Sequence, residues 1–136
     1  MTQDEARGLF AGARVARLAT VDADGRPHLV PITFAAAGDM VWSAVDEKPK
    51  RTRRLRRLEN VAREPRVALL ADHYDDSDWG ALWWVRADGA GRVLEAGDAA
   101  AAIALLTERY AQYRDAPPRG PVLEIAVERW SGWRAR

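Results

Sequence analysis

Seven positively charged side chains lie between residues 48 and 57, one third of the 21 basic residues of the chain. Because the whole protein has a net charge of only +1, this basic segment creates a local site for an anion. Leu55, Leu58 and Val61 are spaced as one apolar face of a helix. The unpaired amides and the dipole at the start of that helix favour a phosphate. Two other interpretations stay open: a solvated arginine-rich face, and a groove for single-stranded nucleic acid, against which the low net charge weighs.

The six tryptophans are a second source of candidate binding residues. Large aromatic side chains with a polar N–H group are frequent at interfaces and against planar ligands. Trp83 and Trp84 are neighbours in a predicted strand, so their side chains must point to opposite faces. We expect Trp42 to fill the core. Interface or ligand contact is as good an interpretation as core packing for four others: Trp83, Trp84, Trp130 and Trp133.

No side chain in the sequence offers itself as a catalyst. The acidic segment 72–78 carries oxygens that could bind a divalent cation, but it lacks a recognised metal-loop spacing and is better interpreted as a solvated loop. There is no cysteine, there are only two histidines, and no serine lies in a Gly-x-Ser-x-Gly context. Gly89-Ala90-Gly91 lacks the third glycine and the following helix of a dinucleotide-binding turn. The chain is therefore either a binding protein or an enzyme whose cofactor carries the reaction.

A length of 136 residues predicts one domain, 1–136, with one core. Hydrophobic residues make up 48% and charged residues 30%, which is typical of a soluble globular protein. Because so short a chain leaves little interior for a large ligand, a cofactor site is expected at an edge or between subunits. The absence of cysteine, of an apolar leader and of a membrane-length apolar window predicts a cytoplasmic protein without a membrane segment.

The elements that must position these residues follow from hydrophobic periodicity. Thr2 and Glu5 fit a capping box, which predicts a helix over 3–11. Apolar segments between turn residues predict strands over 15–21, 28–34, 40–45, 66–72, 81–86, 92–96 and 122–127. Turns are predicted at 22–25 and 88–91, and a helix at 98–114. The pattern indicates a mainly β, α+β protein: a small barrel of about six strands with helices around it.

Three stretches resemble the pyridoxamine-phosphate-oxidase-like split-barrel flavoproteins: VARLATVDADGRPHLVPI at 15–32, DEKPK at 46–50 and PRV at 65–67. Four others look like the actinobacterial branch that uses the deazaflavin coenzyme F420: KPK at 48–50, DHYD at 72–75, LWWVR at 82–86 and WSGW at 130–133. The likeness extends over nearly the whole chain. The first hairpin is shared by FMN-binding, deazaflavin-binding and haem-binding relatives, so it specifies the fold better than the cofactor.

The resemblance implies a six-stranded antiparallel split β-barrel of the FMN-binding type with flanking helices. It also implies a homodimer with two cofactor sites in grooves between the subunits. Residues matching Ala19, Thr20 and Val21 would supply backbone contacts and an apolar wall to the tricyclic ring, and Trp83 or Trp84 would border the ring or the dimer seam. Four cations would hold the cofactor's phosphate: Lys48, Lys50, Arg53 and Arg54.

The function implied by the resemblance is hydride transfer between reduced F420 and a small organic acceptor, with the protein orienting the two and no catalytic side chain or metal. One alternative is an FMN-dependent oxidoreductase on the same barrel, whose shorter phosphate tail would need fewer cations. Another is a carrier that binds F420 or a flavin without turnover. A nucleic-acid module is the last, and it would bind oligonucleotides with a steep salt dependence.

Overall fold

The computed structural model describes residues 1–45 and 55–136. Helix α1 (Gln3–Gly12) begins at Thr2, whose hydroxyl accepts a hydrogen bond from the Glu5 amide at 3.1 Å, which confirms the predicted cap. The first strands follow at β1 (Ala16–Val21), β2 (Pro27–Ile32), β3 (Ala35–Ala37) and β4 (Met40–Ala44). The turns between them use Gly25 and Gly38 at φ of 80° and 58°, a backbone region that only glycine enters without strain.

The second half of the chain alternates strands with short helices. Its elements are α2 (Arg56–Arg63), β5 (Arg66–His73), the 3-10 helix η1 (Trp79–Ala81), β6 (Trp83–Leu94), the 3-10 helix η2 (Ala96–Asp98), α3 (Ala100–Arg109), α4 (Ala111–Asp115) and β7 (Val122–Arg134). The segment 130–133, expected as a tail after the last strand, is the end of β7 and pairs with β6.

The turn predicted at 88–91 is wrong, because β6 passes through it without a break. The register between β6 and β7 shifts between Asp88 and Gly89. A Cβ atom on Gly89 would lie 2.3 Å from the carbonyl oxygen of Ala126. The Asp-Gly pair therefore marks a β-bulge where two backbones approach closely, not a hairpin turn.

The helix predicted over 98–114 is interrupted at Tyr110, whose φ of −118° and ψ of 126° are extended. The Tyr110 hydroxyl lies 3.0 Å from the carbonyl oxygens of Arg14 and Phe34 and accepts a bond from the Phe34 amide at 3.1 Å. These tertiary hydrogen bonds hold Tyr110 out of helical geometry, an effect that helical periodicity does not record.

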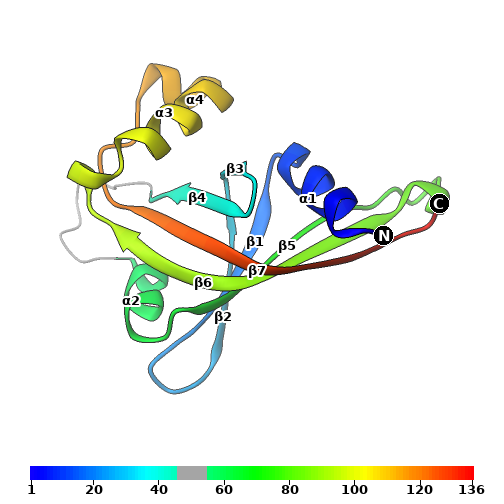
Figure 1. The fold of residues 1–136 in the computed structure, drawn as a ribbon, viewed down its shortest axis with the longest axis horizontal. Helices are drawn as coiled ribbons and strands as arrows, with labels where there is room; N and C mark the ends of the chain where they lie inside the picture. The colour runs from blue at the N-terminus through cyan, green and yellow to red at the C-terminus, as the bar shows by residue number, and fades with distance from the viewer. Residues whose placement is uncertain (46–54) are drawn as a thin grey trace.

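All strand pairs are antiparallel, and the described strands form one seven-stranded sheet in the order β2-β1-β5-β6-β7-β4-β3. The sheet therefore has seven strands and not six. Strand β3 was not predicted, and the strands predicted over 81–86 and 92–96 are the two halves of β6. Strands β2 and β3 are the ends of this order, so the sheet curls around a core without closing (Figure 1). The mainly β class with flanking helices is confirmed.

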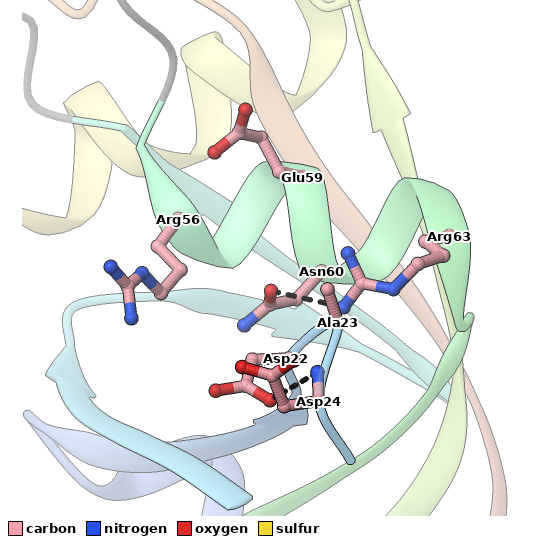
Figure 2. A pocket seen from close by; sticks show the side chains of 7 residues that line it. All are labelled: Asp22, Ala23, Asp24, Arg56, Glu59, Asn60 and Arg63. Atoms are coloured by element: carbon pink, nitrogen blue, oxygen red, sulfur yellow. Dashed lines mark hydrogen bonds between the residues drawn. The ribbon is translucent and has the colours of Figure 1, made fainter. Parts of the chain in front are cut away.

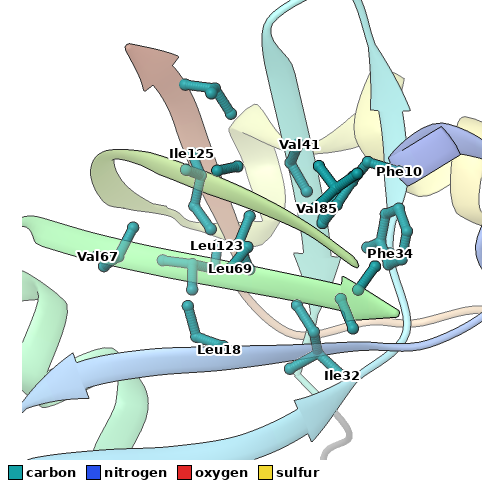
Figure 3. Close-up of a cluster of buried hydrophobic side chains, with 14 of the residues drawn as sticks. Phe10, Leu18, Ile32, Phe34, Val41, Val67, Leu69, Val85, Leu123 and Ile125 are labelled. Carbon is teal, nitrogen blue, oxygen red and sulfur yellow. The ribbon is translucent and has the colours of Figure 1, made fainter. Parts of the chain in front are cut away.

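The main core lies inside the curl and is sealed by α1 and α2 (Figure 3). Phe10 of α1 packs on Phe34 and Trp130, with ring centroids 4.7 and 5.4 Å apart. A second, smaller cluster lies under α3, around Leu106 and Tyr110. Trp42 is half-buried against that cluster and donates to Glu124 at 2.8 Å.

Alternation places the remaining side chains of β2, β1, β5 and β6 on the opposite, outer face of the sheet. Leu29, Leu70 and Trp84 are exposed there, at 67%, 39% and 37% of their surface. Across residues 1–45 and 55–136, no helix has the length and apolar character needed to cross a membrane.

Candidate functional site

An open groove of about 580 Å³ lies on the outer face of the sheet, and we call it the outer groove. Its lining comprises Arg17, Ala19, Leu29, Ala68, Leu69, Leu70, Asp72, Trp84 and Arg86. Ala19 of β1 and Ala68 of β5 are cross-strand partners. Because neither has a side-chain atom beyond Cβ, they form a low apolar floor between larger side chains. Such a floor suits a planar ring system.

The charged side chains of the outer groove differ in how they are paired. The Nε atom of Arg86 lies 3.2 Å from the Asp88 carboxylate. Within the part of the chain that the structure describes, Arg17 and Asp72 have neither an ion pair nor a side-chain hydrogen bond. One cation and one carboxylate are therefore available to a ligand or partner on an otherwise apolar surface.

A second, polar pocket of about 340 Å³ lies between α2 and the turn after β1 (Figure 2). It is lined by Asp22, Ala23, Asp24, Arg56, Glu59, Asn60 and Arg63. The Asn60 amide is 2% exposed and donates to the Thr20 hydroxyl at 3.0 Å. Arg63 donates to the Val21 carbonyl at 2.7 Å and to the Asn60 side-chain oxygen at 3.3 Å. These bonds tie α2 to the end of β1.

The carboxylate of Asp22 is kept ionised by its own turn. It accepts hydrogen bonds from the backbone amides of Arg26 and Asp24, both at 2.9 Å, and these bonds lower the pKa of Asp22 below its usual value. The polar pocket thus holds carboxylates and guanidinium groups together. Its buried amide, Asn60, already has partners on both its nitrogen and its oxygen, so we assign the pocket a structural role.

The predicted ring-binding residues divide between the two faces of the sheet. Ala19 and Trp84 come together in the outer groove. Val21 shares the outer face, but its carbonyl is taken by Arg63. Thr20 is buried on the inner face, where it binds Asn60, and Trp83 packs partly buried against the main core. Opposite orientations for Trp83 and Trp84 are confirmed.

The backbone of β1 is largely used by the sheet. Residues 17–19 pair with β2 on one side and β5 on the other, so Ala19 offers a ligand its methyl group and not its amide. The predicted phosphate-binding cations Lys48, Lys50, Arg53 and Arg54 lie outside the described residues.

Sequence reasoning missed several residues that the structure places in these sites. Asn60 gave a signal, since it is a polar residue between the apolar positions Leu58 and Val61 of a helix. Ala68 and Leu70 are outward-facing by strict alternation with buried Val67 and Leu69. Nothing local, however, indicates that β5 lies beside β1, and that pairing creates the groove floor.

The acidic segment forms a loop whose carboxylates mostly serve the loop itself. Asp75 accepts from the Ser77 hydroxyl at 2.7 Å and Asp76 from the Tyr74 hydroxyl at 2.7 Å, while Asp78 accepts from the Gly80 amide at 3.0 Å. Among the described residues, no group of three or more acidic, histidine or cysteine side chains is arranged to hold a metal ion.

The antiparallel sheet is curled, and its edge strands β2 and β3 do not pair with each other. Helices seal its inner face, and a groove lies on its outer face. These features define a split-barrel protein. The family model described as pyridoxamine 5'-phosphate oxidase matches residues 2–134. The chain therefore belongs to the pyridoxamine 5'-phosphate oxidase family.

Solved structures share this fold at low sequence identity. A conserved hypothetical protein from Mycobacterium tuberculosis is 22% identical with a TM-score of 0.79, over 100% of this chain and 86% of the other. A FAD-binding protein from Mesorhizobium loti is 20% identical with a TM-score of 0.71, over 97% and 94%. The FAD-binding protein from Mycobacterium smegmatis is 20% identical with a TM-score of 0.67, over 100% and 98%. Among curated proteins, none matches this chain.

Proposed function

We propose that this protein is an oxidoreductase that binds a flavin-type tricyclic cofactor in the outer groove. The observation that carries the proposal is the low apolar floor made by the cross-strand pair Ala19 and Ala68 in a groove of about 580 Å³. Membership of the pyridoxamine 5'-phosphate oxidase family supports it. So does the similarity to structures described as FAD-binding proteins from Mesorhizobium loti and Mycobacterium smegmatis.

The groove fits a planar ring because its floor is small and its walls are large. Leu29 on β2 is the cross-strand partner of Ala19, and Trp84 lies on β6, four residues along the strand from Asp88, the partner of Ala68. Leu29 and Trp84 both line the groove and are exposed. A bound ring would remove their apolar surface from water, which stabilises a complex by roughly 25 cal/mol per Å². The chain's own residues thus hold one face of the ring, fix its orientation and exclude water from it. The cofactor, when bound, supplies hydride transfer.

The groove is open on its outer side, and we propose that a second copy of the chain covers part of it in a homodimer. Leu29 and Leu70 are exposed apolar residues beside unpaired Arg17 and unpaired Asp72 in the described structure. A two-fold interface needs such a self-complementary surface, with a cation and a carboxylate that can exchange between copies.

A flavin such as FMN or FAD is the first candidate cofactor, because two of the similar structures are described as FAD-binding proteins. The deazaflavin F420 is the second candidate, favoured by the seven basic residues between 48 and 57, which suit a longer anionic tail. Fluorescence titration of the protein with FMN, FAD and F420 at two salt concentrations distinguishes them. Saturable binding of one cofactor supports the proposal, and binding of none overturns it.

Ala19→Arg tests whether the outer groove is the cofactor site. The long side chain would occupy the floor, so we expect cofactor affinity to fall at least about tenfold. Ala104→Arg on the exposed surface of α3 is the matched control and should bind like the natural protein. Equal cofactor affinity of the two variants would show that the cofactor does not bind in the outer groove. Turnover of an acceptor by the reduced, bound cofactor separates an enzyme from a carrier.

A further inference from the structure

We propose that the loop between β5 and β6, residues 74–82, is a docking site for an arginine-rich segment of another protein. Five residues of this loop form what we call the acidic-aromatic tip: Tyr74, Asp75, Asp76, Asp78 and Trp79. None of these five described residues lines the outer groove. The proposal therefore does not depend on cofactor binding.

Tyr74 and Trp79 carry the most exposed aromatic rings of the described structure, at 58% and 66% of their surface. Neither belongs to a core cluster, whereas Trp83 and Trp130 pack into the main core. The indole N–H groups of Trp42 and Trp130 donate to carboxylates, and that of Trp79 has no hydrogen-bond partner among the described residues. An exposed ring that adds nothing to the core is typical of an anchor residue in a protein interface.

Hydrogen bonds hold the acidic-aromatic tip in one shape before any partner binds. The Asp75 carboxylate accepts from the hydroxyl and the backbone amide of Ser77, at 2.7 and 2.9 Å, and these bonds lower the pKa of Asp75. Asp78 accepts from the Gly80 amide at 3.0 Å. Because the loop is already ordered, docking costs little of its conformational entropy.

The acidic-aromatic tip is negatively charged in a protein whose net charge is +1. Residues 72–79 include four aspartates and no lysine or arginine. Within the described structure, the guanidinium of Arg136 lies 3.5 Å from Asp78. The Asp76 carboxylate is bound by the neutral Tyr74 hydroxyl, at 2.7 Å, and so keeps its full charge. Four carboxylates against one guanidinium leave a negative potential around the two exposed rings.

Arginine is the side chain that matches this combination of rings and carboxylates. Its guanidinium stacks on an aromatic face and donates to carboxylates at the same time. A nucleic acid would meet like charge, and a purely apolar segment would bury the carboxylates without partners. Figure 1 shows this loop beside the C-terminus, at the end of the sheet away from α2, α3 and α4, where a large partner can reach it.

Isothermal titration calorimetry tests the proposal with two capped peptides, one of alternating glycine and arginine and one of alternating glycine and glutamate. We expect saturable binding of the arginine peptide, with an affinity that falls as salt is added. No binding is expected for the glutamate peptide. An arginine peptide that does not bind, or equal binding of the two peptides, would overturn the proposal.

Trp79→Ala should weaken binding of the arginine peptide at least about tenfold, because it removes the anchor. Leu105→Ala on α3 is the matched control, since Leu105 is also exposed, at 38%. Asp76→Asn should weaken binding about threefold. Asp24→Asn removes the same charge from the exposed turn after β1 and should have no effect. Equal affinities within either pair of variants would count against the acidic-aromatic tip.

A second copy of the chain is the competing occupant, since its residues 48–57 include seven basic side chains. Sedimentation velocity of Trp79→Ala separates the two partners. We expect Trp79→Ala to have the same oligomeric state as the natural protein. A dimer that is lost in Trp79→Ala and kept in Leu105→Ala would show that the tip docks on a second copy, and would overturn the proposal.

Discussion

At the scale of single residues, small side chains and glycines determine where backbones approach. Gly89 allows β6 and β7 to remain paired through the bulge, and Gly91 has the Val61 side chain 3.1 Å from where a Cβ would lie. Ala19 and Ala68 leave the groove floor open in the same way, since their side chains end at Cβ. Small side chains thus decide both where the backbones approach and how deep the groove is.

Gly89→Ala should destabilise the protein strongly, because the added Cβ would lie 2.3 Å from the Ala126 carbonyl oxygen and force β6 and β7 apart. We expect a loss of about 3 kcal/mol in the free energy of unfolding, measured by urea denaturation. Gly8→Ala is the control: a Cβ there has no atom within 4 Å, and alanine favours helix α1 by about 1 kcal/mol. A Gly89→Ala protein as stable as the natural one would contradict the bulge.

At the scale of elements, side-chain hydrogen bonds link the helices to the sheet and to one another. Asn60 and Arg63 hold α2 against the end of β1. Arg109, at the end of α3, donates to the carbonyls of Ala11 and Ala13 at the end of α1. Since α1 and α2 seal the core inside the curl, these contacts keep the sheet in the shape that presents the outer groove.

Asn60→Ala should separate α2 from β1, because it leaves the buried Thr20 hydroxyl without its partner. The expected loss is about 2 kcal/mol in the free energy of unfolding, from the cost of an unpaired buried polar group. Glu59→Gln, on the exposed side of the same helix, should change stability little. A double-mutant cycle with Thr20→Val should show coupling, and additive losses would argue against the Asn60–Thr20 bond.

At the scale of the whole molecule, α1 and α2 cover the inner face of the sheet, and α3 and α4 lie at one corner of it beside β4 (Figure 1). Of the described residues, none from these helices lines the outer groove, on the opposite face of the sheet. The proposed homodimer would bury that face.

Leu70→Arg should convert the proposed dimer to a monomer, because it adds a charge to the middle of the apolar outer face. Leu105→Arg on α3 is a matched control, since Leu105 and Leu70 are almost equally exposed, at 38% and 39%. Sedimentation velocity measures the oligomeric state of each variant directly. A natural protein that sediments as a monomer, or a Leu70→Arg dimer, would reject this interface.

Much of the fold could be predicted locally. The cap at Thr2, the first hairpin and the alternation in β1 and β5 depend on short-range chemistry, and the structure agrees with them. Tyr110 and Gly89 were misjudged because distant partners, Phe34 and Ala126, decide their conformation. The candidate site could be predicted only in part. The sequence singles out Ala19 and Trp84, whereas Ala68 and Asp72 join them in the groove only through strand pairing.

The sequence alone determined the class of fold and the opposite orientations of Trp83 and Trp84, because periodicity and residue chemistry are local properties. Only the tertiary structure decided that β5 lies between β1 and β6. That order places Ala19 beside Ala68 and Asp72 beside Trp84. Ala19 and Ala68 are 49 positions apart in the chain. Such a contact has no local signature, since its energy is gained only when the chain folds.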